Sequence, residues 1–289
     1  MAVYGRSYRR YTGEITPTGS RFLILPRYAY ETVFKSKLFL IFYALCFLVP
    51  FLGLLAIYLC NNLNVLSFLQ VPVEELKEFF SIGKNFFYRG MWFQGAASFV
   101  LVFLVGPALI SPDLRNNGLA LYLSRPFSRG EYVLGKMSVL LILLSSITWI
   151  PGLLLFLFQS VLDPKWMGPN LNLAFAIFVG SWVWILFLSL LALTISAWVK
   201  WMPVARIAMI VLFFVSIGFA NAINEMLDTW WGTLISAWYP MASIWDSLFG
   251  IVPDADLPPP GASWAALIVG SALCLWLLSR RIRAYEVVR

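Results

Sequence analysis

Six long apolar runs constrain the fold of this chain more than any other feature of its sequence. A helix needs about 20 consecutive apolar residues to cross the roughly 30 Å hydrocarbon core of a bilayer. The runs cover residues 38–60, 91–111, 132–161, 171–199, 203–223 and 263–279. Two cations fall within them, Lys136 and Arg206, each near a helix end, where a long side chain can reach the interface. The pattern predicts an all-α polytopic membrane protein with six transmembrane helices.

The composition argues against a soluble protein and against an enzyme. The 289 residues are 61% hydrophobic and 12% charged, whereas soluble domains have about 25% charged residues. Histidine, the commonest metal ligand and general base near neutral pH, is absent. Cys46, Cys60 and Cys274 are isolated, with no CxxC spacing for a metal or redox pair. We therefore expect a non-catalytic membrane protein with no cofactor or metal of its own.

The distribution of Lys and Arg predicts the orientation in the membrane. Cytoplasmic segments of membrane proteins are enriched in these residues. Residues 1–37, the connections after the second and fourth runs, and the C-terminal tail carry 17 of the 21, whereas the other connections carry four. This bias predicts a multi-pass protein of the bacterial inner (plasma) membrane with both termini cytoplasmic. The formal charge of +7 then reflects topology and contact with membrane lipids, and no nucleic-acid partner is expected.

The chain divides into a cytoplasmic N-terminus, residues 1–37, and a transmembrane domain, residues 38–289. Residues 25–37 are predicted to form an amphipathic helix that lies along the inner interface. Its charged stripe consists of Arg27, Glu31 and Lys35, spaced by four residues. Its apolar side consists of Ala29, Tyr30, Val33 and Phe34.

The segment between the last two runs is long and aromatic. Trp230, Trp231, Trp238 and Tyr239 precede the run Pro258–Pro259–Pro260. Trp and Tyr favour the headgroup level of a bilayer. We expect short re-entrant or interfacial helices here on the outer side, with an irregular loop resting on the membrane as the alternative.

The connection between the second and third runs has a distinct local pattern. Its sequence, residues 106–136, is GPALISPDLRNNGLALYLSRPFSRGEYVLGK. Pro112 is predicted to end the second span, and Asn116–Asn117–Gly118 to form a turn. Residues 119–124 are expected to form a short helix that Pro126 stops. Ser128 and Glu131 have the spacing of a capping box, so the third span should begin near Arg129.

Residues 130–136 also match the GxxxxGK frame of a phosphate-binding loop. Met137 occupies the position at which a Ser or Thr would bind Mg²⁺, and no strand precedes the segment. Its amides are expected to be bonded within a helix, so we do not predict a nucleotide site here.

The same connection resembles the conserved loop of the type-2 ABC export permease family. The resemblance is carried by ISPDLRNNGLALYLSRPFSRGEYVLGK, with Asn116–Asn117 in place of a more usual charged or serine pair. It implies that the loop holds a coupling helix that docks on a separate ABC ATPase subunit, where ATP and Mg²⁺ bind. It also implies a second permease copy or a related permease, because six spans make a half-unit. Matched by position, the residues expected at the ATPase interface are Asp113, Arg115, Gly118, Arg125, Pro126, Arg129, Glu131 and Lys136.

Other readings remain open at this point. An ion-coupled secondary transporter would place ionisable groups within the spans, and the nearest candidates are Asn221 and Asn224. An ABC-type complex could also serve the assembly of extracytoplasmic enzymes rather than bulk export.

Flex points or static kinks are expected at Pro50, Gly106–Pro107 and Pro151–Gly152. Pairs of small residues that could allow close helix packing are Ala176/Gly180, Gly218/Ala222 and Ala266/Gly270.

Overall fold

The computed structural model describes residues 24–62, 82–118, 128–254 and 256–282. Every regular element in these ranges is a helix, and none is a strand. Six stretches are long and apolar enough to cross a membrane: Lys37–Asn61, Lys84–Arg115, Arg129–Leu162, Pro164–Trp198, Met202–Leu227 and Pro260–Arg281. The all-α, six-span prediction is therefore confirmed.

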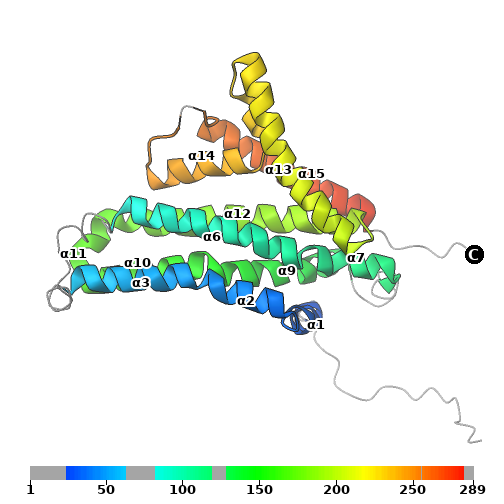
Figure 1. The fold of residues 1–289 in the computed structure, drawn as a ribbon, viewed down its shortest axis with the longest axis horizontal. Coiled ribbons are helices and arrows are strands. Elements are labelled where there is room, and N and C mark those ends of the chain that lie inside the picture. Colours follow the sequence, from blue (N-terminus) through cyan, green and yellow to red (C-terminus); the bar gives the residue numbers. More distant parts are fainter. Residues whose placement is uncertain (1–23, 63–81, 119–127, 255, 283–289) are drawn as a thin grey trace, which may run out of the picture.

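Several spans are built from more than one helix. The elements in chain order are α1 (Ile24–Val33), α2 (Lys37–Cys46), α3 (Leu48–Asn61), α6 (Lys84–Val105), α7 (Pro107–Arg115), α9 (Arg129–Ile147), α10 (Trp149–Leu162), α11 (Pro164–Met167), η2 (Gly168–Asn170), α12 (Leu171–Trp198), α13 (Met202–Leu227), η3 (Trp231–Ile235), α14 (Trp238–Phe249) and α15 (Pro260–Arg281). In Figure 1, α7, α1 and the last turns of α15 lie at one end of the bundle, which we call the α7 end. The opposite end, where α11 lies, is called the α11 end.

The predicted proline kinks are present, displaced toward the N-terminus. The first span breaks at Phe47, three residues before Pro50, and the third at Thr148, three residues before Pro151. A proline ring has no N–H to donate and clashes with the carbonyl four residues earlier, so the break falls in the preceding turn. The carbonyl that Pro50 leaves free is that of Cys46, and the side-chain amide Nε2 of Gln94 donates to it at 3.1 Å.

One sequence prediction about the second span is wrong. Pro112 does not end it: the helix continues through Pro112 to Arg115, and the span instead breaks at Gly106, before Pro107. The predicted turn follows at once, because Asn117 has a left-handed φ of 52°.

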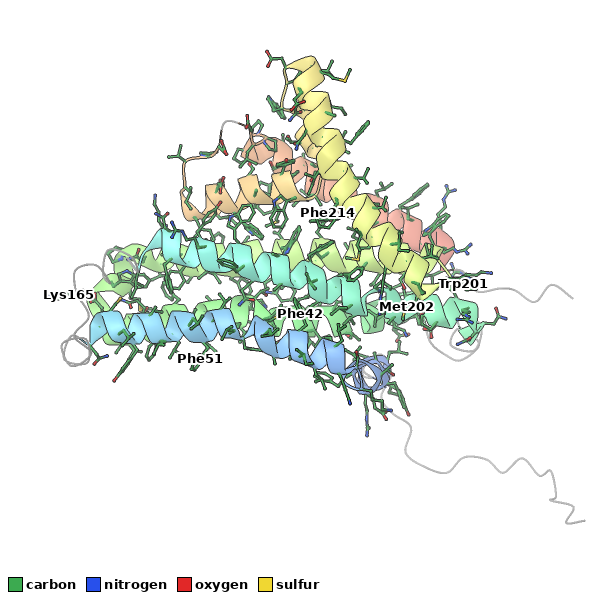
Figure 2. The ribbon with its side chains drawn as sticks, viewed as in Figure 1. Phe42, Phe51, Lys165, Trp201, Met202 and Phe214 are labelled. Atoms are coloured by element: carbon green, nitrogen blue, oxygen red, sulfur yellow. The ribbon has the colours of Figure 1, made fainter. Side chains whose placement is uncertain are left out.

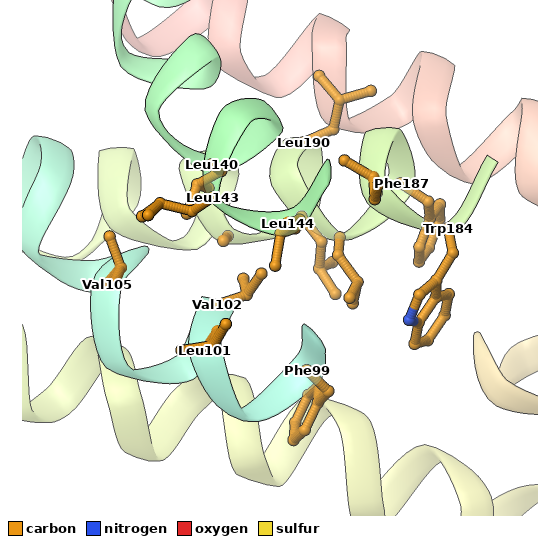
Figure 3. Close-up of a cluster of buried hydrophobic side chains, with 14 of the residues drawn as sticks. Phe99, Leu101, Val102, Val105, Leu140, Leu143, Leu144, Trp184, Phe187 and Leu190 are labelled. Carbon is orange, nitrogen blue, oxygen red and sulfur yellow. The ribbon is translucent and has the colours of Figure 1, made fainter. Parts of the chain in front are cut away.

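The fourth span is the centre of the bundle. In its most apolar 18-residue stretch, the span Pro164–Trp198 is 72% buried. The corresponding stretches of the first and fifth spans are 11% and 17% buried. Figure 3 shows how α6, α9 and α12 meet around side chains such as Val102, Leu144 and Trp184, each at most 1% exposed. Close packing of this kind, rather than the hydrophobic effect alone, holds membrane helices together.

Helix α1 has the expected amphipathic packing. It is seen almost end-on in Figure 1, so it runs across the bundle axis rather than along it. Leu25 and Val33 are buried, and the Tyr30 hydroxyl donates to the Val139 carbonyl of α9 at 3.2 Å. The charged stripe is exposed and contains the Glu31–Lys35 ion pair at 3.3 Å. This orientation suits a helix in the plane of a membrane interface.

The segment before the last span is helical, as expected. Helix α14 packs against α12 and α15, and the Trp245 indole donates to the Gly180 carbonyl at 3.2 Å. A Cβ added at Gly180 would lie 2.9 Å from Trp245, so a small residue is needed at that position. The pair Ala176/Gly180 thus serves packing within the chain.

The first and fifth spans expose apolar side chains on their outer surfaces. Phe51 on α3 is 64% exposed and lies at the lower edge of the molecule in Figure 2. Phe214 on α13 is 58% exposed. Helix α13 also diverges from the bundle axis, and its C-terminal end projects past α14 (Figure 1). Such surfaces are suited to contact with lipid or with another membrane helix.

Candidate functional site

The structure describes six of the eight residues predicted at a partner interface. Asp113, Arg115 and Gly118 lie in or just after α7, and Arg129, Glu131 and Lys136 lie in the first two turns of α9. Arg125 and Pro126, and the short helix expected over residues 119–124, lie outside the described residues. The six described positions are gathered at the α7 end, on the two sides of one connection (Figure 1).

Asp113 and Lys136 bind each other across this connection. The Lys136 ammonium lies 2.8 Å from the Asp113 carboxylate, and the two side chains are only 10% and 18% exposed. The Tyr132 hydroxyl donates to the same carboxylate at 2.7 Å, and the Lys136 ammonium also lies 5.6 Å from the Tyr132 ring centre. A charge-assisted hydrogen bond between largely buried partners is strong and directional. We call these three residues the 113–132–136 cluster; it fixes the end of α7 to the start of α9.

The start of α9 has the predicted capping box. The Ser128 hydroxyl accepts from the Glu131 amide at 3.2 Å, and the Glu131 carboxylate accepts from the Ser128 amide at 2.6 Å. Both bonds satisfy amide donors that a helix N-terminus otherwise leaves unpaired. Arg129 is exposed beside them. The cap fixes where the connection enters the third span.

Specific contacts also hold the α7 side of the connection. Arg115, in the last turn of α7, places its guanidinium 5.3 Å from the ring centre of Trp201, which lies just before α13. Figure 2 shows Trp201 and Met202 at this end of the bundle. Gly118 lies close to Asp113, since a Cβ added there would meet the Asp113 carbonyl at an ordinary 3.5 Å. The turn at Asn117 therefore folds the chain back toward the 113–132–136 cluster.

Ser196, which the sequence did not single out, secures α7 to the central span. Its hydroxyl accepts from the amides of Ile110 at 3.1 Å and Ser111 at 2.9 Å, and contacts the Pro107 carbonyl at 3.2 Å. Ile110 and Ser111 are the fourth and fifth residues of α7, so Ser196 binds the second turn of this helix from α12. Ser196 is fully buried. This contact joins α7 to the central span.

Arginine–tryptophan contacts surround the same end of the bundle. Arg280 lies 4.4 Å from the Trp276 ring centre, and Arg281 lies 5.6 Å from that of Trp198 while its Nε donates to the Ala197 carbonyl at 3.3 Å. Tryptophan with arginine is typical of the interface between hydrocarbon and water.

The GxxxxGK segment is not built as a phosphate-binding loop. Residues 130–136 form the first turns of α9, whose amides are bonded within the helix. The Lys136 ammonium, which would have to reach a phosphate, is bound to Asp113.

The residues considered for an ion-coupled transporter have structural partners. Asn224 accepts from the Gly232 amide at 2.9 Å, and Asn221 accepts from the Tyr239 hydroxyl at 2.7 Å, so both secure α13 to the segment that follows it. The sequence did not predict that Asp246 of α14 is only 4% exposed, with its carboxylate accepting from the Tyr88 hydroxyl. Burial raises the pKa of Asp246, and the Tyr88 hydrogen bond acts in the opposite direction.

No protein-family model matches this chain, and no curated protein matches it. Its function must therefore be inferred from its own residues and their arrangement.

Proposed function

We propose that this chain is the membrane permease subunit of an ATP-driven exporter of the type-2 ABC class. The observation that carries the proposal is that the connection between α7 and α9 is secured at both ends. The 113–132–136 cluster joins those two helices, and Ser196 joins α7 to the central α12. A connection held in this way transmits a displacement to three spans, which is what a coupling element requires.

The mechanism follows from these contacts. A separate ABC ATPase subunit, which holds ATP and Mg²⁺, binds the connection and moves it when the ATPase closes. Because α7 contacts both α9 and α12, the movement reaches the second, third and fourth spans together. The breaks at Gly106 and Thr148 divide the second and third spans and are the places where they can bend.

The residues around the connection suit an ATPase partner. Arg129 is exposed at its α9 side, next to Glu131, and Arg115 at its α7 side is held beside Trp201. Asp113 and Lys136 are turned toward each other, so within the proposed interface they position the loop while Arg125, Arg129 and Glu131 contact the ATPase.

A second permease copy, or a related permease, completes the transporter in this proposal. Helix α13 exposes the small pair Gly218/Ala222, and a Cβ added at Gly218 would meet nothing within 4 Å. Small residues on an exposed membrane helix allow another helix to approach closely.

We expect both termini and the α7 end to be cytoplasmic, in a bacterial inner membrane. In a chain with the three native cysteines replaced, Gly130→Cys should react with an impermeant maleimide only after cells are permeabilised. Lys165→Cys at the α11 end, labelled in Figure 2, should react in intact cells. Both positions are exposed, and Gly130→Cys leaves the capping box unchanged. Labelling of residue 130 in intact cells would overturn the orientation.

Charge substitutions in the connection test the coupling role. Arg125→Glu and Glu131→Arg should abolish the ATP hydrolysis that the partner subunit shows with the wild-type permease, while the protein still inserts. Glu131→Gln keeps a side chain able to accept in the capping box, so it separates lost charge from a lost helix cap. Normal hydrolysis with both charge reversals would refute the assignment.

One observation favours an ion-coupled secondary transporter as the second candidate. Asp246 is a buried carboxylate bound to Tyr88, and buried acids in membrane proteins often mark ion pathways. In that case Asp246→Asn should abolish transport, and transport by the wild-type chain should need an ion gradient and no ATPase. An ABC-type complex that serves the assembly of extracytoplasmic enzymes would share the coupling element and differ only in its cargo.

A further inference from the structure

A cavity of about 480 Å³ lies between α3, α6 and α10. Its walls are mainly apolar, with Leu52 and Leu59 from α3, Phe86 from α6 and Leu155 from α10 among the lining residues. Its volume is within the range of about 300–1,000 Å³ that is typical of sites for small molecules. The 113–132–136 cluster lies at the α7 end and takes no part in lining it.

The cavity exists because α3 does not pack closely on α6 along this length. The first span breaks at Phe47, and beyond the break α3 contacts α10 more than α6. Gly90 leaves space on the α6 side, since a Cβ added there would meet nothing within 4 Å. Leu52, Leu55 and Phe93 line the cavity and are 51%, 44% and 64% exposed. The cavity therefore opens sideways, toward the region that lipid tails occupy around a membrane span.

Two polar side chains that can donate hydrogen bonds line one end of the cavity. Asn85 and Arg89, in the first turns of α6 at the α11 end, both line it and are exposed. Arg89 makes no ion pair with any side chain in the described ranges. Arginine recognises phosphate oxygens well, because its planar guanidinium can donate two parallel hydrogen bonds.

The length of the cavity matches one leaflet. Along α6 it extends from Asn85 to Gln94, and nine residues of helix rise about 13.5 Å. Half of a hydrocarbon core of about 30 Å is about 15 Å. One acyl chain can thus extend from the headgroup level, at Asn85, to the middle of the bilayer, where Val49 and Thr148 border the cavity. Arg89 lies one turn further in, and its long side chain can reach the headgroup.

We propose that this cavity binds one acyl chain of an anionic phospholipid from the leaflet at the α11 end, with its phosphate against Arg89 and Asn85. The proposal goes beyond the proposed function and does not depend on it, since no ATPase takes part. It also holds for either orientation of the chain in the membrane.

The test uses the full chain in nanodiscs that contain a photoactivatable phosphatidylglycerol or, separately, a photoactivatable phosphatidylcholine. The attachment sites are mapped by peptide mass spectrometry. The phosphatidylglycerol probe should label α3 and α10 residues that line the cavity. Gly90→Leu fills the cavity, so it should reduce this labelling by about tenfold. Leucine has a higher helix propensity than glycine, so the variant should keep α6 intact. Gly261→Leu, at another open position near the start of α15, should leave it unchanged.

A substitution of Arg89 tests the contact with the lipid headgroup separately. Arg89→Gln should reduce phosphatidylglycerol labelling by about fivefold, to the level of phosphatidylcholine, because one nearby cation contributes attraction of that size. Lys165→Gln, a cation at the same end but outside the cavity, should preserve the preference. Equal labelling in wild type and Gly90→Leu, or no more labelling of α3 and α10 than of α13, would overturn the proposal. Labelling that Arg89→Gln leaves unchanged would overturn the phosphate contact.

Discussion

Lys136→Met should lower the thermal unfolding midpoint of the purified protein by about 6–12 °C. Removing one partner of a buried ion pair leaves the other charge uncompensated, which costs roughly 3 kcal/mol or more, and a loss of that size corresponds to about 2–4 °C per kcal/mol in a chain of this length. Here the charge left behind is the Asp113 carboxylate, 18% exposed, whose remaining partner among the described residues would be the Tyr132 hydroxyl. Thermal unfolding in detergent, followed by near-UV circular dichroism, measures the effect.

The chain offers a matched control for this prediction. Lys35→Met removes the lysine of the Glu31–Lys35 pair, whose side chains are 62% and 74% exposed. Exposed pairs of this spacing contribute about 0.3–0.5 kcal/mol, so the midpoint should change by no more than about 2 °C. The exchange of both charges, Asp113→Lys with Lys136→Asp, should recover part of the lost stability. Equal midpoints for Lys136→Met and Lys35→Met would show that the 113–132–136 cluster does not secure the connection.

Ser196→Ala should lower the free energy of unfolding by about 2–4 kcal/mol. Its hydroxyl is the acceptor for the amides of Ile110 and Ser111, and each buried donor left without a partner costs about 1–3 kcal/mol. The change removes a single oxygen atom from a fully buried position, so lost packing adds little. Because Ser196 holds α7 against α12, the variant should also reduce ATP hydrolysis by the proposed partner subunit.

Ser189→Ala is the control for this second prediction. Ser189 lies on the same helix, is equally buried, and its hydroxyl has no hydrogen-bond partner among the described residues. Its removal should change the free energy of unfolding by less than about 0.5 kcal/mol, or stabilise the protein slightly. A similar loss in both variants would mean that Ser196 contributes only as a small buried side chain.

The sequence predicted the features that depend on neighbouring residues. The six spans follow from runs of apolar residues, and the start of α9 follows from the spacing of Ser128 and Glu131. The turn at Asn117 likewise needs only a residue that tolerates a left-handed conformation. Each of these features depends on residues that are close together in the sequence, so the local pattern was sufficient to predict it.

Features that depend on distant residues could not be predicted. Ser196 is one serine in a 28-residue apolar helix, and its partners lie more than 80 positions earlier in the chain. Proline is usually found at helix ends, but α7 continues through Pro112 to Arg115, so the predicted end of the second span was wrong. No local pattern indicates the burial of Asp246, because it results from the packing of α14 against α12 and α15.

In the candidate site too, contacts between distant residues could not be predicted from the sequence. Asp113 and Lys136 were both expected at the ATPase interface, but no pattern along the chain indicated that they bind each other across a 23-residue separation. The roles of Arg125, Arg129 and Glu131 toward a partner stay predictions, since they depend on a second protein.

Co-purification from native membranes tests the central claim most directly. The tagged chain is solubilised in mild detergent and captured, and the accompanying proteins are identified and quantified by mass spectrometry. We predict an ATP-binding subunit in stoichiometric amount, lost when Arg125→Glu and Glu131→Arg are combined and retained in Lys35→Met. Recovery of a stable, folded chain without any ATPase would contradict the proposal and favour the ion-coupled transporter.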